Sequence, residues 1–169
     1  VNGADAKTLR IASRDYCNTL DPAYMNTSWV EFPIMNSIYN GLVKYKPGSF
    51  EVVPDLAKDW EISKDETEIT FYLRKGVQFH KGYGEFTGED VKFTFERILK
   101  DKSGPYRSAF AALDHVEVVD KYTVKLILKR PMAQLFTSSL PFNAGLILSK
   151  DAVKEMCKEK FAHNPIGTG

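Results

Sequence analysis

Two neighbouring stretches decide the fold class: residues 68–73 read EITFYL and residues 87–99 read TGEDVKFTFERIL. In the first stretch every second residue is apolar, which is the period of a half-buried strand. In the second, Val91, Phe95 and Ile98 recur at helical spacing behind a Thr-Gly-Glu-Asp start that resembles a capping box. The two periods predict a sheet with a helix packed on it.

Further elements follow from apolar spacing and turn residues on both sides of these stretches. The expected strands cover residues 8–12, 42–46, 60–73 as a hairpin around residues 64–66, 116–128 as a second hairpin, and 145–148. The expected helices cover residues 27–41, 87–100, 133–138 and 150–160. Hairpins mixed with helices, without strict alternation of strand and helix, favour an α+β fold.

Charge and hydropathy exclude several classes of protein. Lys and Arg number 23 and Asp and Glu number 22, which leaves a net charge of +1 and no basic footprint for nucleic acid or a charged membrane surface. The apolar runs are only a few residues long, whereas a membrane-spanning helix needs about 20. The sequence does not open with a secretory signal. We therefore expect neither a nucleic-acid partner nor a membrane span.

The sequence carries no local signature of a cofactor, a metal or a catalytic nucleophile. Gly82, Gly84 and Gly88 form a GxGxxxG pattern that is one residue longer than the dinucleotide fingerprint, and a turn before a capped helix explains these glycines better. The three histidines are isolated from one another in sequence, so we expect no metal site. Cys17 and Cys157 leave a single disulfide open, because sequence alone does not show proximity.

Two loops carry side chains suited to holding a small ligand. One joins soft, polar and aromatic groups at the expected start of a helix, where free backbone N–H groups can meet a carboxylate or a peptide carbonyl. Its candidate residues are Met25, Asn26, Thr27, Ser28 and Trp29. The other places Tyr106 and Arg107 after Gly-Pro, where the backbone is restricted. The competing interpretation is that Trp29 and Tyr106 cover the core and that Arg107 is solvated.

The order of short motifs along the chain resembles the N-terminal part of the family 5 extracellular solute-binding proteins, the peptide- and nickel-binding components of bacterial and archaeal ABC importers. The residues that carry the resemblance are 20–22 (LDP), 38–42 (IYNGL), 53–57 (VPDLA) with 60–61 (WE), 71–80 (FYLRKGVQFH), 87–91 (TGEDV) and 164–169 (NPIGTG). Residues 82–86 depart from the family's loop before the capped helix.

The resemblance implies a two-lobed fold of the periplasmic-binding-protein type II class that closes around its ligand. Residues 1–42 then form the N-terminal segment of lobe one, and residues 43–169 form a subdomain appended to it. The remainder of lobe one and all of lobe two are absent from this sequence. The implied role is non-enzymatic capture of peptides outside the cytoplasmic membrane and delivery to ABC permease subunits. A lipid anchor is excluded at Cys17 but not on a preceding N-terminus.

Candidate ligand contacts also follow from the resemblance. The stretch from Met25 to Trp29 matches a family segment that touches ligand, and Tyr106 and Arg107 match positions where some members place an aromatic residue and an arginine near the cleft. Phe142 and Asn143 are further candidates. Two alternatives stay open: a nickel or metal-chelate binder that uses Met25, Arg107 and a histidine, and a hydrolase of peptides or glycans.

Overall fold

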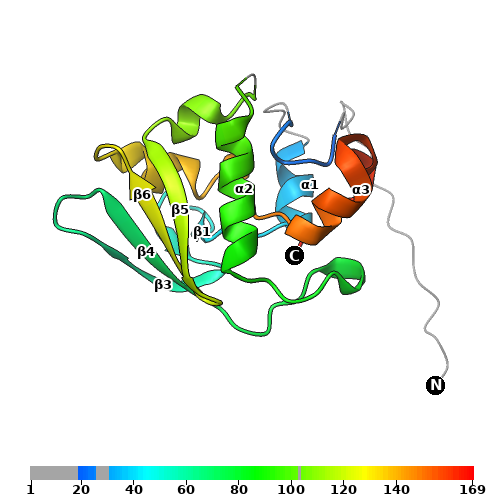
Figure 1. Ribbon diagram of the computed structural model, residues 1–169, viewed down its shortest axis with the longest axis horizontal. Helices are drawn as coiled ribbons and strands as arrows, with labels where there is room; N and C mark the ends of the chain where they lie inside the picture. The colour runs from blue at the N-terminus through cyan, green and yellow to red at the C-terminus, as the bar shows by residue number, and fades with distance from the viewer. Residues whose placement is uncertain (1–18, 26–30, 103) are drawn as a thin grey trace.

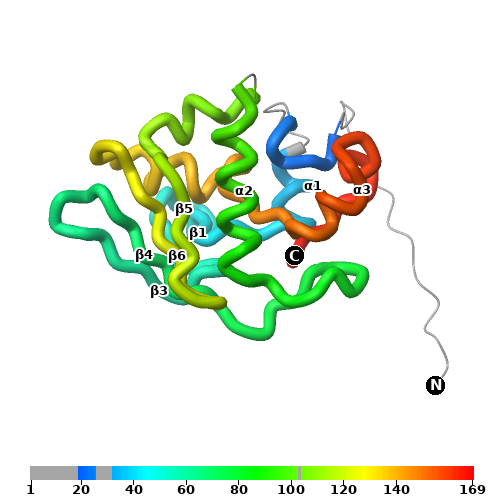
Figure 2. The backbone as a smooth tube through the Cα atoms, in the orientation of Figure 1, coloured from blue at the N-terminus to red at the C-terminus, as the bar shows by residue number. Residues whose placement is uncertain are grey.

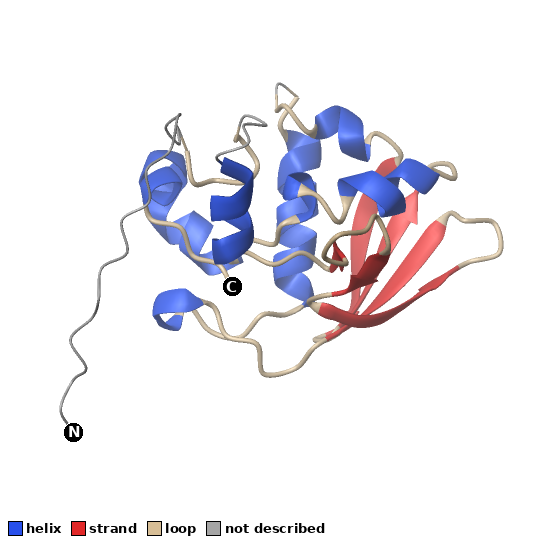
Figure 3. Cartoon of the chain, turned by 180° about the vertical axis from the view of Figure 1, so that it is seen from behind, coloured by secondary structure: helices blue, strands red, loops and turns tan. Residues whose placement is uncertain are grey.

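The computed structural model describes residues 19–25, 31–102 and 104–169. Figure 1 shows helix α2 (Gly88–Lys100) between a sheet on one side and helices α1 (Glu31–Ile38) and α3 (Lys150–His163) on the other, and Figure 3 shows the same order from behind. The strands are β1 (Val43–Tyr45), β2 (Val52–Pro54), β3 (Ala57–Ile62), β4 (Glu68–Leu73), β5 (Leu113–Asp120) and β6 (Thr123–Leu128). Short helical turns lie at η1 (His80–Gly82), η2 (Arg107–Phe110), η3 (Leu135–Ser139) and η4 (Asn143–Gly145). The predicted α+β class is confirmed.

The main sheet has four antiparallel strands in the order β3-β4-β6-β5, and β1 and β2 form a separate pair. On its inner face Phe71 lies opposite Val124 and Ile69 opposite Leu126, and all four side chains are buried. Each buried side chain of this size stabilises the fold by about 1.5–3 kcal/mol relative to exposure. Both predicted hairpins are confirmed, because β3-β4 and β5-β6 pair where the alternation placed them.

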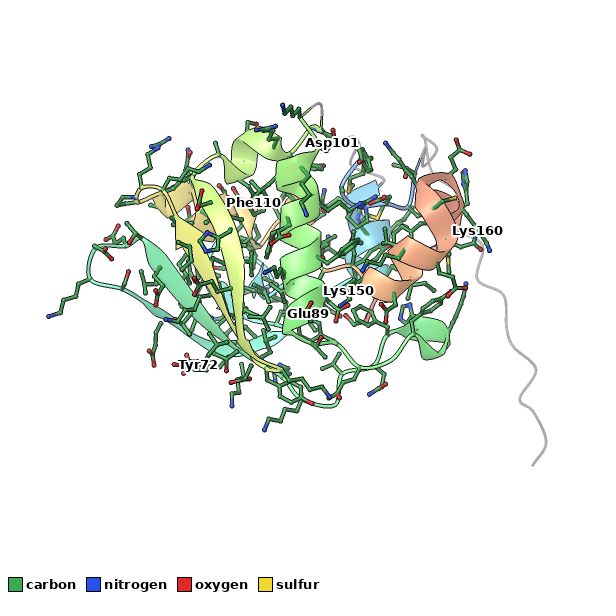
Figure 4. All side chains as sticks on the ribbon, viewed as in Figure 1. Tyr72, Glu89, Asp101, Phe110, Lys150 and Lys160 are labelled. Carbon is green, nitrogen blue, oxygen red and sulfur yellow. The ribbon has the colours of Figure 1, made fainter. Side chains whose placement is uncertain are left out.

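Helix α2 covers this inner face. Its apolar side packs on β5 and β6, and the ring of Phe95 lies 5.2 Å from the ring of Phe110, which Figure 4 shows between the sheet and α2. The predicted capping box is present: the Asp90 carboxylate accepts hydrogen bonds from the Thr87 N–H (3.0 Å) and hydroxyl (3.1 Å). Part of the hydrophobic core therefore lies between the sheet and α2.

Asp90 also ties α2 to α3. Its second carboxylate oxygen accepts the N–H of Lys150, the first residue of α3, at 3.0 Å. Burial raises the pKa of Asp90 above its ordinary value, although these hydrogen bonds oppose the shift. The predicted cap of α3 is confirmed, because the Ser149 hydroxyl accepts the N–H of Ala152 at 3.2 Å. The beginnings of the two helices are thus held together.

Two sequence-based expectations are corrected. Residues 145–148 do not form a strand: η4 is followed by one isolated bridge between Gly41 and Leu146, and the Leu148 N–H then donates to the Thr94 hydroxyl at 3.0 Å. A short apolar run looks the same whether it is buried in a sheet or between other elements. The expected helix over 133–138 is present as a π-helical turn at Leu135–Ser139.

Other expectations fall partly or wholly outside the described residues. The strand over 8–12 lies outside them, and so does the start of the helix expected over 27–41, of which the structure describes Glu31–Ile38. Cys157 is free and exposed within the described part of the chain, and Cys17 lies outside it. The disulfide question therefore stays open.

The last residues return to the end of α1. The Gly169 N–H donates to the Ile38 carbonyl at 3.0 Å, and the Thr168 hydroxyl donates to the Asn40 side chain at 2.9 Å. Figure 2 shows this end of the trace next to the helices α1 and α3. Residues 38–40 and 168–169 therefore lie side by side.

Candidate functional site

The two candidate loops meet at Met25 and Tyr106. Met25 is buried, with 1% of its surface exposed, and the Tyr106 hydroxyl donates to the Met25 carbonyl at 3.1 Å. These residues are 81 positions apart in sequence, so the contact is a product of the fold. Asn26, Thr27, Ser28 and Trp29 lie outside the described residues, and their role stays a prediction.

Tyr106 is positioned by the turn that follows α2. It immediately precedes η2, and the Arg107 N–H donates to the Gly104 carbonyl while the Ala109 N–H donates to the Tyr106 carbonyl. The Tyr106 ring packs against the core as a partly buried side chain. The Tyr106 ring therefore covers part of the core, as the competing interpretation expected. Its hydroxyl, in contrast, contacts Met25.

Arg107 lies on a different surface. Its exposed side chain lines a hollow of about 470 Å³ together with Lys102 and Lys129, whereas Tyr106 lines a separate small pocket beside Tyr24 and Arg97. The remaining lining residues of the larger hollow are Leu99, Gly104, Ser108, Ala111 and Leu113. The structure therefore separates Tyr106 and Arg107, which the sequence had paired, and gives Arg107 a basic environment.

Phe142 and Asn143 form a third position. The exposed ring of Phe142 lies 5.0 Å from the ring of Phe32 on α1, tilted by 31°. Asn143, the first residue of η4, is 1% exposed, and within the described part of the chain neither its amide oxygen nor its amide nitrogen has a hydrogen-bond partner. A buried, unsatisfied polar group of this kind costs about 1–3 kcal/mol.

A polar groove beside these residues was not found from the sequence. It has a volume of about 350 Å³ and lies between α1 and the β1-β2 pair, with Phe32 and Leu146 among its walls. Inside it the Asp55 carboxylate accepts from Asn40 at 3.1 Å and pairs with Lys44 at 3.0 Å. Asn40 and Asp55 lie in the motifs that carried the family resemblance, but nothing in their spacing predicts that they meet.

Two of the three histidines, His80 and His115, have structural partners. His80 contacts the Gly169 carbonyl at 2.7 Å and accepts the Gly167 N–H at 3.4 Å, and His115 lies between the carboxylates of Asp114 and Glu117. These two carboxylates raise the pKa of His115. Across residues 19–25, 31–102 and 104–169, no three His, Cys, Asp or Glu side chains gather as metal ligands.

No helix among the described residues is long and apolar enough to span a membrane.

The fold matches that of a solute-binding protein over most of this chain. Residues 51–169 match the family described as bacterial extracellular solute-binding proteins, family 5 Middle, and the chain belongs to this family. It is 33% identical to Di/tripeptide-binding protein 2 of Pseudomonas aeruginosa over 98% of this chain and 35% of that protein. It is 34% identical to the dipeptide-binding protein of Escherichia coli over 97% of this chain and 34% of that protein.

A solved structure supports the same assignment. The periplasmic binding protein DppA from Helicobacter pylori, in complex with the peptide STSA, superposes with a TM-score of 0.81 at 33% identity, over 90% of this chain and 33% of that one. The chain thus spans about a third of the length of the relatives it matches.

Proposed function

We propose that this chain supplies one wall of the ligand cleft of a peptide-binding component of an ABC importer. That component captures a short peptide outside the cytoplasmic membrane and delivers it to permease subunits. The observation that carries the proposal is the likeness to di- and tripeptide-binding proteins along almost the whole chain. In this proposal residues 1–42 belong to lobe one and residues 43–169 form its appended subdomain.

The described residues offer the groups that a peptide needs. A peptide backbone presents one donor and one acceptor per residue, and the Asn143 amide has no partner among the described residues. Because Asn143 is buried, its amide would offer the complementary pair only after a local rearrangement that exposes it. The Phe142 ring, exposed beside it, offers an apolar surface to a ligand side chain. In this proposal the Met25 and Tyr106 contact belongs to the same wall.

Binding of this kind requires no covalent chemistry. Affinity comes from main-chain hydrogen bonds, from apolar contact and from closure of a second lobe, because a single wall leaves most of a small ligand exposed to water. We therefore propose a transport role and expect the isolated chain to bind peptide weakly compared with the full-length protein.

Calorimetric titration of the full-length protein with synthetic di- and tripeptides tests this function. The expected result is saturable binding of at least one peptide, with the peptide recovered intact. Binding of a nickel chelate in place of all peptides would move the protein to the metal-binding branch. Cleavage of the added peptide would contradict the transport role, and absence of any peptide binding would refute peptide capture.

A further inference from the structure

A buried ion pair joins the segment 19–25 to the last turns of α2. The Asp21 carboxylate accepts two hydrogen bonds from the Arg97 guanidinium, at 3.0 Å to Nη1 and 2.6 Å to Nη2. The Asp21 side chain is 1% exposed and that of Arg97 is 15% exposed. This fork geometry fixes direction as well as distance, because both guanidinium donors are aligned with both carboxylate oxygens.

Tyr24, in the same segment, lies against two cationic side chains. The Tyr24 ring centroid lies 5.1 Å from the Arg97 guanidinium carbon and 3.5 Å from the Lys158 ammonium of α3. Its hydroxyl donates to the Asp101 carboxylate at 2.7 Å, at the end of α2 that Figure 4 labels. Burial and this hydrogen bond raise the pKa of Tyr24 to about 12, so the hydroxyl stays a donor at physiological pH.

Main-chain contacts complete the attachment of this segment. The Leu20 N–H donates to the Ala162 carbonyl of α3 at 2.8 Å, and the Leu20 carbonyl accepts the Tyr39 hydroxyl at 2.8 Å. Within the segment, the Asp21 carboxylate also accepts the Ala23 N–H at 3.1 Å. One acidic side chain thus shapes the local turn and docks it on α2, a few residues before Met25.

Stability alone does not explain such a pair. Burying two charges costs desolvation energy that their attraction often only repays, so a buried ion pair is weak evidence for net stabilisation. Its geometric effect is large, because an unpaired Asp21 or Arg97 charge would have to leave this position. The main effect of the ion pair is therefore to fix the position of segment 19–25.

We propose that Asp21 and Arg97 are positioning residues, which hold segment 20–25 so that the Met25 carbonyl and the Tyr106 hydroxyl keep their places in the ligand wall. The inference rests on the proposed function for its effect on affinity. Neither residue needs to touch the ligand. Their effect reaches it through Met25 and Tyr106, which are joined at 3.1 Å.

Asp21→Asn in the full-length protein tests the proposal, because asparagine keeps the size of the side chain but turns an amide NH₂ group toward the guanidinium donors. Two quantities are measured: hydrogen exchange of the amides of residues 20–25 without ligand, and the affinity for the dipeptide alanyl-phenylalanine. We expect exchange at least tenfold faster and a Kd at least tenfold higher. Arg97→Lys keeps the charge but loses the two-pronged hydrogen bond. Its exchange rate and its Kd are expected to fall between those of wild type and Asp21→Asn.

A matched control separates positioning from loss of stability. Leu126→Ala removes a buried side chain from the sheet. It is expected to lower the melting temperature at least as much as Asp21→Asn does, while its Kd stays within twofold of wild type. If Asp21→Asn lowers the melting temperature but leaves either the exchange or the Kd within twofold of wild type, the proposal is overturned. If wild type binds no peptide, the proposed function fails, and exchange of residues 20–25 alone then supports or overturns the positioning role.

Discussion

The buried Asn143 side chain has no hydrogen-bond partner among the described residues, a cost that a ligand reaching it is expected to remove. Replacing it with leucine, which is similar in size and needs no partners, is expected to raise the free energy of unfolding by about 1–2 kcal/mol. The same change is expected to weaken peptide binding in the full-length protein. Urea unfolding without ligand and calorimetric titration with peptide measure the two effects.

Asn40→Leu is the matched control for this substitution. Asn40 is hydrogen-bonded to Asp55 and Thr168, so the change breaks satisfied contacts and is expected to destabilise the protein by about 1–3 kcal/mol. If both leucine variants destabilise the protein equally, Asn143 is satisfied in solution and its proposed role in binding is wrong.

Gly167 marks a place where the backbone leaves no room for a side chain. A Cβ atom there would lie 1.9 Å from the Ile38 carbonyl oxygen, so Gly167→Ala requires main-chain movement. We expect a loss of about 3 kcal/mol in unfolding free energy. Gly104→Ala, whose Cβ would meet its nearest atoms at an ordinary 3.4 Å, is expected to stay within about 0.5 kcal/mol. Thermal unfolding of both variants compares them, and equal melting temperatures would contradict the close approach.

For single residues, the sequence predicted which side chains take part better than it predicted which of them contact one another. It named Met25 and Tyr106 as candidates on separate loops, and the fold joined them. It also paired Tyr106 with Arg107, although consecutive residues in an irregular turn face different directions. The lack of a described partner for the Asn143 amide depends on every neighbouring backbone group, which no spacing rule reports.

Among the structural elements, Glu85 joins the loop after β4 to the turn between β5 and β6. Its carboxylate accepts hydrogen bonds from Lys121 Nζ (2.8 Å), the Gly76 N–H (2.6 Å) and the Tyr122 hydroxyl (2.9 Å). The Lys121 hydrogen bond, with those of Gly76 and Tyr122, lowers the pKa of Glu85 from 4.5 to about 2. The folded state thus favours the ionised carboxylate.

The acid dependence of stability is expected to follow from this shift. The Glu85 contribution is present above pH 4.5 and is lost as the pH falls toward 2, because the unfolded chain takes up a proton first. Glu85→Gln is expected to flatten the stability curve between pH 4.5 and 2. Urea unfolding of wild type and Glu85→Gln across this range measures the difference. An unchanged slope in Glu85→Gln would contradict the assignment.

Elements with strong periodicity were predictable, and those defined by tertiary contacts were not. The hairpins and α2 follow directly from alternation and from the Thr87 and Asp90 pair. The apolar run 145–148 has no alternation to distinguish a strand from a buried irregular segment, and its main chain is satisfied by Asn40 and Thr94 instead of a ladder. Helix α3 continues past a positive φ of 56° at Cys157, which the sequence does not indicate.

For the whole molecule, the last residues contribute to one continuous core. Ile166 is fully buried in the same cluster that contains Met25 and the inner face of the sheet. Ile166→Ala is therefore expected to cost about 2–5 kcal/mol, whereas Ile62→Ala, at a position 48% exposed, is expected to cost less than about 1 kcal/mol. Circular dichroism and tryptophan fluorescence are expected to report one shared transition, and separate midpoints would contradict a single core.

The hydrogen bond between Gly169 and Ile38 places the beginning and the end of 130 intervening residues next to each other. A stretch of chain whose ends meet in this way can be spliced into a loop of a host protein without displacing the flanking host backbone. The two ends of this stretch are thus fixed to each other, so neither end can move without the other.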